Sequence, residues 1–416
     1  MALTKLRGRV AVFASTIFWV LRIASMGQEQ QNSFEVHTIK SGWGYHSAAF
    51  TPGDGQLAVI AVKGFREEQG LQITQELQIW DFRNIRLTSE QILSREKSSP
   101  DATYEKIAIY GYVRSGSMIL LCRNDHLLLL DSQTLREIRK IGLATGKWPA
   151  VPPPNGFSFI KGVTVDKDGR RAAVLLQWER SGGGELRVYD LNSGVLVRSW
   201  DYHSLRKNDR NADFGGADIS ADGRRVAVSV IPFLLGEGAL HSPDRNVFVL
   251  DVDSGATISE INTGYPAEDV RFAPTEPPVL LTVSADNYDR HRSRQDTIKV
   301  WDPVSGRLLR ELASAPAGVH FQVQTSSDGR IVLGYTGAEK FIGRWWLGQE
   351  ENGLVEYDQF TLWDLASGKV IASSPQIKPA QSHGCFLISP NGDVVLLYPQ
   401  TSDGETLTLY ELRRTP

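Results

Sequence analysis

The sequence repeats one short pattern seven times, and this repeat restricts the possible folds more than any other feature. Each copy is an apolar, strand-like segment that ends in an acidic residue. The acidic residues lie 47 to 62 residues apart, at Asp81, Asp131, Asp190, Asp251, Asp302, Asp364 and Glu411. Similar units at this spacing, with little helical periodicity, predict one large all-β domain built from seven sheets.

Turn signals divide each unit into four strands, which we call A, B, C and D in chain order. An Asp-Gly pair often separates strand A from strand B, and a Ser-Gly pair often follows the acidic residue that ends strand C. Both pairs supply the positive φ that a tight hairpin needs. The Asp-Gly pairs end at Gly169, Gly223 and Gly329, and the Ser-Gly pairs end at Gly194, Gly255, Gly306 and Gly368.

The last unit lacks a strand D, because the chain ends at Pro416, soon after Glu411. Residues 34–39 alternate apolar and polar side chains and precede the first strand A. We expect this N-terminal segment to pair as the outer strand of the last sheet. Both ends of the chain would then close a ring of sheets and leave no incomplete sheet.

The unit resembles the repeat of the WD-repeat β-propeller family. The segment Thr297-Ile-Lys-Val-Trp-Asp302, followed by the Ser305-Gly306 turn and Arg-Leu-Leu-Arg-Glu-Leu, is close to the family's strand C–turn–strand D consensus. The resemblance implies a seven-bladed β-propeller of four-stranded antiparallel blades. The family's Gly-His pair before strand A is replaced by Gly44-Tyr45, Gly215-Gly216 and Gly264-Tyr265, which leaves open the hydrogen bonds that link that His to the strand C Asp.

The resemblance also implies which face of the propeller carries function. In this architecture the A–B and C–D turns lie on one face, and the B–C and D–A loops lie on the other. Almost every insertion falls in the second group, at residues 63–76, 94–106, 142–156, 178–185, 201–214, 231–246, 287–297 and 335–359. Loops on a rigid scaffold are common binding sites, so we expect the loop-rich face to bind a partner.

The strongest candidate binding segment is the B–C loop of blade 6. It contains Arg344, Trp345, Trp346, Glu350 and Glu351. Tryptophan and arginine contribute disproportionately to binding energy at interfaces, so this group suits an anchor for a partner. Alternatively, the two rings cap the central channel or extend strand B of the blade.

A second candidate segment is basic and contains Tyr288, Arg290 and Arg292. It suits an acidic or phosphorylated ligand, although such a charged run can also be a solvated loop. Trp178 is a further candidate binding residue, with the same alternative of packing against the domain itself.

Motifs for catalysis and metal binding are missing from the sequence. There is no Gly-x-Ser-x-Gly, His-Glu-x-x-His or Cys-x-x-Cys motif, and the phosphate-loop-like segment at Gly142 has Trp148 where Ser or Thr would bind magnesium. We therefore expect a protein-interaction scaffold that is not an enzyme, with no catalytic residues, metal or cofactor. A propeller enzyme of the lactonase or quinone-dependent dehydrogenase type stays open as an alternative, as does a carbohydrate or small-ligand receptor.

Two further sequence features resemble known sites but have simpler interpretations. Cys122 is expected on strand B of blade 2 and Cys385 on strand A of blade 7, too far apart for a disulfide. The acidic segments that begin at Asp166 and Asp251 resemble calcium loops, but they occupy the repeating turn positions and are interpreted as turn residues.

The N-terminal residues 1–27 have the pattern of a signal peptide. Three basic residues precede an apolar run at residues 10–21, and Ser25 and Gly27 suit cleavage before Gln28. An uncleaved membrane anchor is the alternative. Cleavage removes four positive charges and changes the net charge from −3 to −7, which disfavours nucleic acid as a partner. We expect residues 28–416 to form a monomeric, periplasmic or secreted propeller that binds an unidentified protein.

Overall fold

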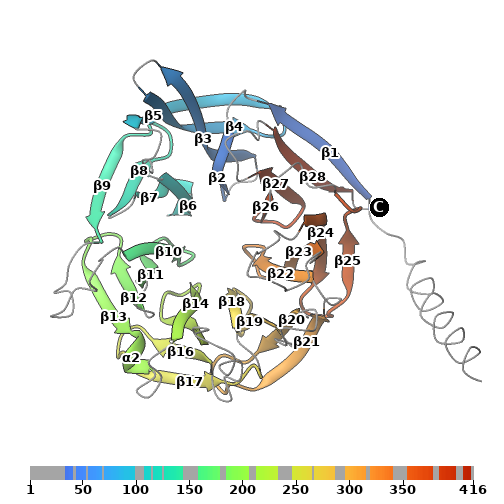
Figure 1. Ribbon diagram of the computed structural model, residues 1–416. Coiled ribbons are helices and arrows are strands. Elements are labelled where there is room, and N and C mark those ends of the chain that lie inside the picture. The colour runs from blue at the N-terminus through green and yellow to red at the C-terminus, as the bar shows by residue number, and fades with distance from the viewer. Residues whose placement is uncertain are drawn as a thin grey trace, which may run out of the picture.

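The computed structural model describes residues 33–40, 44–52, 55–67, 70–98, 107–113, 116–123, 126–143, 158–178, 184–205, 212–232, 246–264, 267–285, 296–314, 319–340, 354–377, 384–399 and 406–413. These residues form seven four-stranded antiparallel sheets, arranged as blades around a central axis (Figure 1). One short helix, α2 (Tyr202–Leu205), follows the third blade. The expected seven-bladed β-propeller is confirmed.

The first strand of each blade lies next to the axis and the last lies at the circumference (Figure 1). Blade 1 contains β2 (Gly44–Phe50), β3 (Gln56–Glu67), β4 (Gly70–Asp81) and β5 (Arg86–Ser98), and blade 2 contains β6 (Ile107–Val113), β7 (Met118–Arg123), β8 (His126–Asp131) and β9 (Glu137–Gly142). Blade 3 contains β10 (Ser158–Val165), β11 (Arg171–Trp178), β12 (Gly184–Asp190) and β13 (Leu196–Asp201), and blade 4 contains β14 (Ala212–Ile219), β15 (Arg225–Pro232), β16 (Val247–Asp251) and β17 (Thr257–Ile261). Blade 5 contains β18 (Ala267–Ala273), β19 (Val279–Ala285), β20 (Asp296–Trp301) and β21 (Leu308–Ser314), and blade 6 contains β22 (Val319–Thr325), β23 (Ile331–Lys340), β24 (Leu354–Asp364) and β25 (Val370–Ser373). Blade 7 contains β26 (Gly384–Ile388), β27 (Val394–Pro399), β28 (Thr406–Arg413) and, as its outer strand, β1 (Ser33–Lys40).

Strand β1 closes the ring as the sequence predicts. It pairs antiparallel with β28 over its whole length, from Ser33 opposite Arg413 to Lys40 opposite Thr406. Ile39 is fully buried, and the ring of Phe34 lies 5.1 Å from that of Phe360 in blade 6. The N-terminal strand therefore completes blade 7 and also contacts its neighbour.

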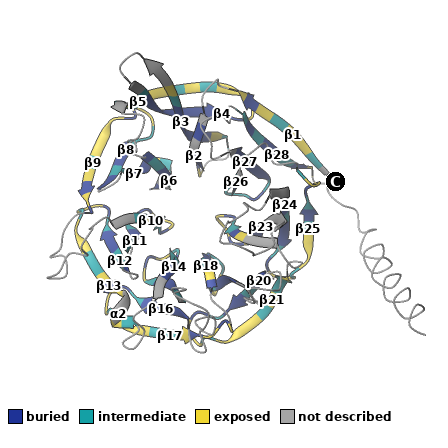
Figure 2. Cartoon of the chain, in the orientation of Figure 1, coloured by how far each residue is buried: buried dark blue, intermediate teal, exposed yellow. Residues whose placement is uncertain are grey.

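The core lies between the faces of adjacent blades. Each hydrophobic cluster joins neighbouring blades; one, for example, contains Leu186 of blade 3 with Phe214 and Val228 of blade 4. Buried residues therefore follow the inner three strands, whereas the outer strands expose one face to solvent (Figure 2). This alternation explains the apolar pattern of strands B and C.

The tight turns use the residues that the repeat predicts. All seven glycines of the Asp-Gly and Ser-Gly pairs have positive φ, between 64° and 81°. In blades 1 and 2 the same position of the C–D turn holds Ile85 (φ 50°) and Leu135 (φ 57°) instead of glycine. A bulky residue is strained in this conformation. Leu135 is buried in the blade 1–blade 2 core, which offsets its strain, but Ile85 is 45% exposed.

The acidic residue at the end of strand C caps its own turn. The hydroxyls of Ser254, Ser305 and Ser367 donate hydrogen bonds of 2.6–2.7 Å to Asp251, Asp302 and Asp364, respectively. These bonds hold the pKa of each carboxyl below its usual value. In these three turns the strand C Asp therefore receives its hydrogen bonds from its own turn. A histidine before strand A is not needed to supply them.

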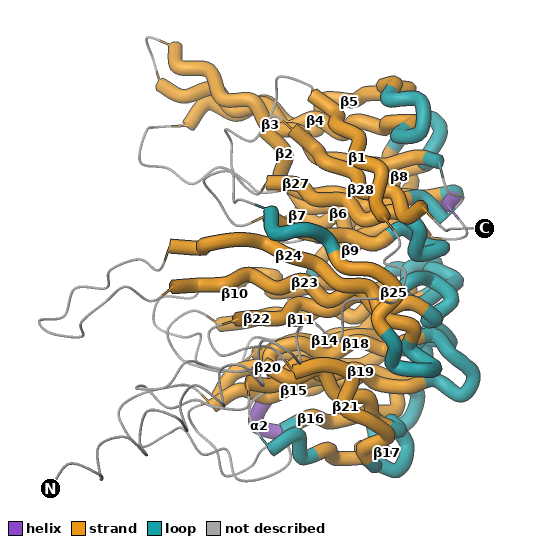
Figure 3. Tube along the Cα trace, turned by 90° about the vertical axis from the view of Figure 1, so that its right-hand side faces the viewer, coloured by secondary structure: helices purple, strands orange, loops and turns teal. Residues whose placement is uncertain are grey.

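In blades 1 and 6, expected insertion loops are partly strand, which corrects the sequence analysis. In blade 1 residues 63–67 and 70–76 continue β3 and β4 as a paired hairpin, and β5 continues to Ser98. In blade 6 β23 and β24 extend to the pair Lys340–Leu354. The pairing leaves two residues between Glu67 and Gly70, which is a favoured length for a hairpin connection. The sequence analysis interpreted the segment as a loop because of its polar composition. The blade 1 extension projects from the side of the disc opposite the short turns (Figure 3).

Candidate functional site

Most of the candidate binding residues predicted from the sequence lie outside the described residues. These are Tyr288, Arg290, Arg292, Arg344, Trp345, Trp346, Glu350 and Glu351. Trp178 is the last residue of β11, where its backbone pairs with Ser158. The flanking strand ends, Ala285 and Asp296 in blade 5 and Lys340 and Leu354 in blade 6, lie at the edge opposite the short turns (Figure 3). Both segments therefore start and end on the loop-rich face.

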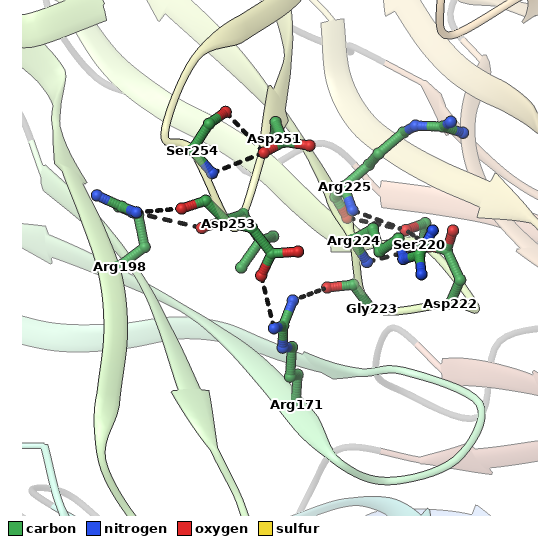
Figure 4. Close-up of polar contacts among 11 residues, drawn as sticks. Arg171, Arg198, Ser220, Asp222, Gly223, Arg224, Arg225, Asp251, Asp253 and Ser254 are labelled. Atoms are coloured by element: carbon green, nitrogen blue, oxygen red, sulfur yellow. Dashed lines mark hydrogen bonds and ion pairs between the residues drawn. The ribbon is translucent and has the colours of Figure 1, made fainter.

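The short-turn face uses its polar groups to join blades. Between blades 3 and 4, Arg171 donates to the carbonyl of Gly223 at 2.9 Å and pairs with the Asp253 carboxylate at 2.7 Å (Figure 4). Arg198 donates to the carbonyls of Val252 and Asp253. These arginines and Asp253 are therefore occupied by contacts within the domain, and the calcium-loop resemblance at Asp251–Asp253 is explained by turn and interblade bonds.

One of these contacts recurs around the ring. The outer-strand residue eight positions after the strand C Asp donates to the C–D turn of the next blade. Arg139 bonds to the Ser193 carbonyl at 3.1 Å, and Ser259 bonds to the Pro303 carbonyl at 2.6 Å, in the same way as Arg198. Repetition in three consecutive interfaces indicates a structural role for this position.

Asp166 is an exception among the A–B turns. Equivalent positions in four other blades hold Thr51, Ser220, Ser326 and Ser389. Asp166 is 4% exposed; its Oδ1 accepts the backbone N–H of Arg170 at 2.7 Å, and its Oδ2 has no hydrogen-bond partner among the described residues. Burial raises the pKa of this carboxyl.

We expect Asp166→Ser to stabilise the protein at neutral pH by about 1 kcal/mol, since an unsatisfied buried polar atom costs about that much. Because the pKa of Asp166 is higher in the folded protein than in the unfolded chain, its ionised form opposes folding above the folded pKa. The gain should therefore disappear as the pH falls below the unfolded pKa. Urea unfolding across this range measures it. Ser220→Asp is the reciprocal control and should destabilise; a loss of stability in Asp166→Ser at neutral pH would contradict this account.

The inner strands carry a charged group that the sequence analysis missed. Asp218 of β14 accepts the backbone N–H of Phe272 across the blade 4–blade 5 interface at 2.7 Å, and its own neighbour Ile219 N–H at 2.9 Å. Arg271 and Asp269 of β18 lie beside it, with Arg271 Nε 3.3 Å from Asp269 Oδ1. Burial raises the pKa of Asp218 to about 6, although Arg271 opposes the shift. The sequence signal for this group was the presence of the charged residues Asp218, Asp269 and Arg271 in the innermost strands β14 and β18.

Sequence expectations about cysteines hold in the structure. Cys122 lies on β7 and Cys385 on β26, the predicted strands, and neither forms a disulfide. In the described ranges, no three His, Cys, Asp or Glu side chains are placed to share a metal ion. Nor is any helix there both long and apolar enough to cross a membrane.

Comparisons with known proteins bear on the fold. No family model matches the chain, and no curated protein sequence matches it. The β-propeller domain of Cps50 (Swd1) from Myceliophteria thermophila is similar in structure, with 12% identity and a TM-score of 0.55 over 91% of this chain and all of that domain. Kuenenia stuttgartiensis hydrazine synthase is 14% identical, with a TM-score of 0.46 over 70% of this chain and 72% of that one. At such low identity the likeness to the Cps50 domain shows the fold alone, a β-propeller.

Proposed function

We propose that the chain is an exported binding scaffold of the WD-repeat type, which docks a protein partner on its loop-rich face. The observation that carries this proposal is the difference between the two faces of the disc. On the short-turn face, polar side chains are occupied by turn caps and interblade bonds. The long connections leave from strand ends at the opposite face, where loops on a rigid frame suit recognition.

Export fits the position of the first strand. The proposed cleavage before Gln28 leaves β1, which begins at Ser33, intact. A mature chain from residue 28 keeps the strand that completes blade 7. In this proposal the propeller binds its partner and does not catalyse a reaction.

The test is a pull-down from the exported fraction of the native cell, with residues 28–416 as bait. We expect a protein that the unchanged bait retains and that a folded Trp345→Ala, Trp346→Ala bait retains at least about tenfold less, since buried tryptophans are typical hot spots. The matched control is Arg330→Ala, a side chain 75% exposed on the short-turn face, which should retain the partner.

One result would contradict the proposed docking anchor, and another would reject the function itself. Equal retention by the double tryptophan variant and the unchanged bait would exclude Trp345 and Trp346 as the docking anchor. If no bait retains a protein, the scaffold proposal fails, and small-molecule or glycan binding becomes the function to test.

A further inference from the structure

The A–B turn of blade 7 contains an Asn-Gly pair where the equivalent turns of blades 4 and 6 contain Asp-Gly. The three pairs end at Gly223, Gly329 and Gly392, and in each turn a serine lies three residues before the glycine. Each glycine has a positive φ of 69–77°, and its N–H donates to the carbonyl of that serine at 2.8–2.9 Å. The backbone is therefore the same in the three turns, and the exchange of Asp for Asn depends on the neighbouring side chains.

The residue two positions further along the chain explains the exchange. In blade 6 this residue is Arg330, whose Nε donates to Asp328 Oδ2 at 2.6 Å. In blade 7 it is Asp393, whose Oδ2 accepts from Asn391 Nδ2 at 2.9 Å and whose backbone N–H donates to Asn391 Oδ1 at 3.3 Å. An ionised carboxylate only accepts hydrogen bonds, so the amide is needed to donate to Asp393. An aspartate at position 391 would instead place two carboxylates side by side.

An asparagine followed by glycine is chemically labile. The backbone nitrogen of Gly392 can attack Cγ of Asn391, because glycine has no side chain to hinder the approach. The new N–Cγ bond forms as the Cγ–Nδ2 bond breaks, and ammonia leaves with the proton of the Gly392 amide. Water then opens the resulting succinimide and gives either aspartate or isoaspartate, in which the main chain is one carbon longer.

The folded turn opposes this attack. The proton that the Gly392 nitrogen must lose is donated to the Ser389 carbonyl at 2.9 Å. The Asn391 side chain is held at both ends, since Oδ1 also lies 3.0 Å from Ser389 Oγ while Nδ2 is bound to Asp393. Neither reacting group is free to move toward the other while these bonds last.

The turn is also tied to the rest of the ring. The backbone N–H of Ser327 in blade 6 donates to the Pro390 carbonyl at 2.8 Å. The backbone N–H of Leu412 donates to the Asp393 carbonyl at 2.7 Å. Leu412 belongs to β28, the strand that pairs with β1 to close the ring. Damage to this turn would therefore act on the blade that completes the propeller.

We propose that Asn391 is a site of spontaneous deamidation that the folded turn protects, and that its conversion to aspartate weakens blade 7. Attack on Cγ requires the turn to open, so the rate in the folded protein is reduced to the fraction of time that the turn is open. Once an aspartate has formed, its carboxylate lies beside that of Asp393, and like charges at this distance repel. The modification thus turns a stabilising hydrogen bond into a repulsive contact.

Peptide mass spectrometry of the full chain, incubated at mildly alkaline pH with and without urea, tests the protection. We expect Asn391 to convert at least about tenfold more slowly in the folded protein than in the unfolded chain. Asn155 is the matched reference in urea, because it also lies between proline and glycine. The two asparagines should convert at similar rates there, which shows that the sequence around Asn391 does not itself slow the reaction.

The variant Asn391→Asp tests the consequence. It should lower the urea midpoint of unfolding by roughly 0.3 M relative to the unchanged protein. The double variant Asn391→Asp, Asp393→Asn should recover the midpoint, because the amide and the carboxylate have then exchanged places and the hydrogen bond can form in the opposite direction. This recovery separates repulsion between carboxylates from a general effect of substitution in the turn.

The proposal is overturned if Asn391 converts as fast in the folded protein as in urea, or does not convert in urea at all. It is also overturned if Asn391→Asp leaves the midpoint unchanged. Should Asn391→Asp fail to fold, the double variant decides, because a double variant that is also unfolded would show that repulsion by Asp393 is not the cause.

Discussion

A chain that begins at Ser41, and so lacks β1, should lose roughly 5 kcal/mol of unfolding free energy relative to residues 28–416. The deletion removes the buried Ile39 and the Phe34 ring that contacts Phe360 and Tyr410. It also exposes the edge of β28 along its full length. The deleted residues no longer lose conformational entropy on folding, which offsets part of this loss. Blade 7, however, would be incomplete where it packs against blades 6 and 1, so we expect a net loss. Urea unfolding followed by circular dichroism measures the difference.

Two substitutions in β1 separate closure from a general effect of truncation. Ile39→Ser removes the fully buried side chain and should cost about 3 kcal/mol. Val36→Ser changes a side chain that is 54% exposed on the same strand and should cost less than about 0.5 kcal/mol. Unchanged stability of the chain that begins at Ser41 would show that the ring does not depend on β1.

The repeat predicted the strands and tight turns of the blades because the sequence patterns that specify them are local. Hairpin glycines such as Gly223 and Gly368 require positive φ whatever the blade, and the structure has them there. The missing strand D of the last unit could be found only because β1 has the alternation that such a strand needs. These inferences depend on spacing within about ten residues, which a single sequence shows directly.

Contacts between blades could not be predicted in the same way. The hydrogen bond from the Phe272 N–H to Asp218 joins residues 54 positions apart in the sequence. It depends on the strand register in both blades and on the bulge at Gly215. The strand extension of blade 1 could not be predicted for a related reason. Its charged residues suggested a loop, whereas residues 63–67 and 70–74 form strand by pairing with each other. The candidate residues around Trp345 stay a prediction.

The bulge at Gly215 gives the second large effect, because three atoms of the neighbouring structure surround the place of a Cβ. A Cβ on Gly215 would lie 2.5 Å from Ser229 Oγ, 2.7 Å from Ile231 Cδ1 and 2.8 Å from the carbonyl oxygen of Ala267 in blade 5. The Ala267 carbonyl is backbone and cannot rotate away. We therefore expect Gly215→Ala to lower the unfolding free energy by about 3 kcal/mol, at the upper end for overpacking by one methyl group.

Gly162→Ala is the matched control, since Gly162 lies at the bulge of β10 and its Cβ would meet nothing within 4 Å. It should change the unfolding free energy by less than about 0.5 kcal/mol. Equal effects of the two substitutions would show that the bulge itself, rather than the close approach of blade 5, sets the cost. A large effect at Gly215 alone would show that this position requires glycine because β14 and β18 approach too closely to admit a side chain.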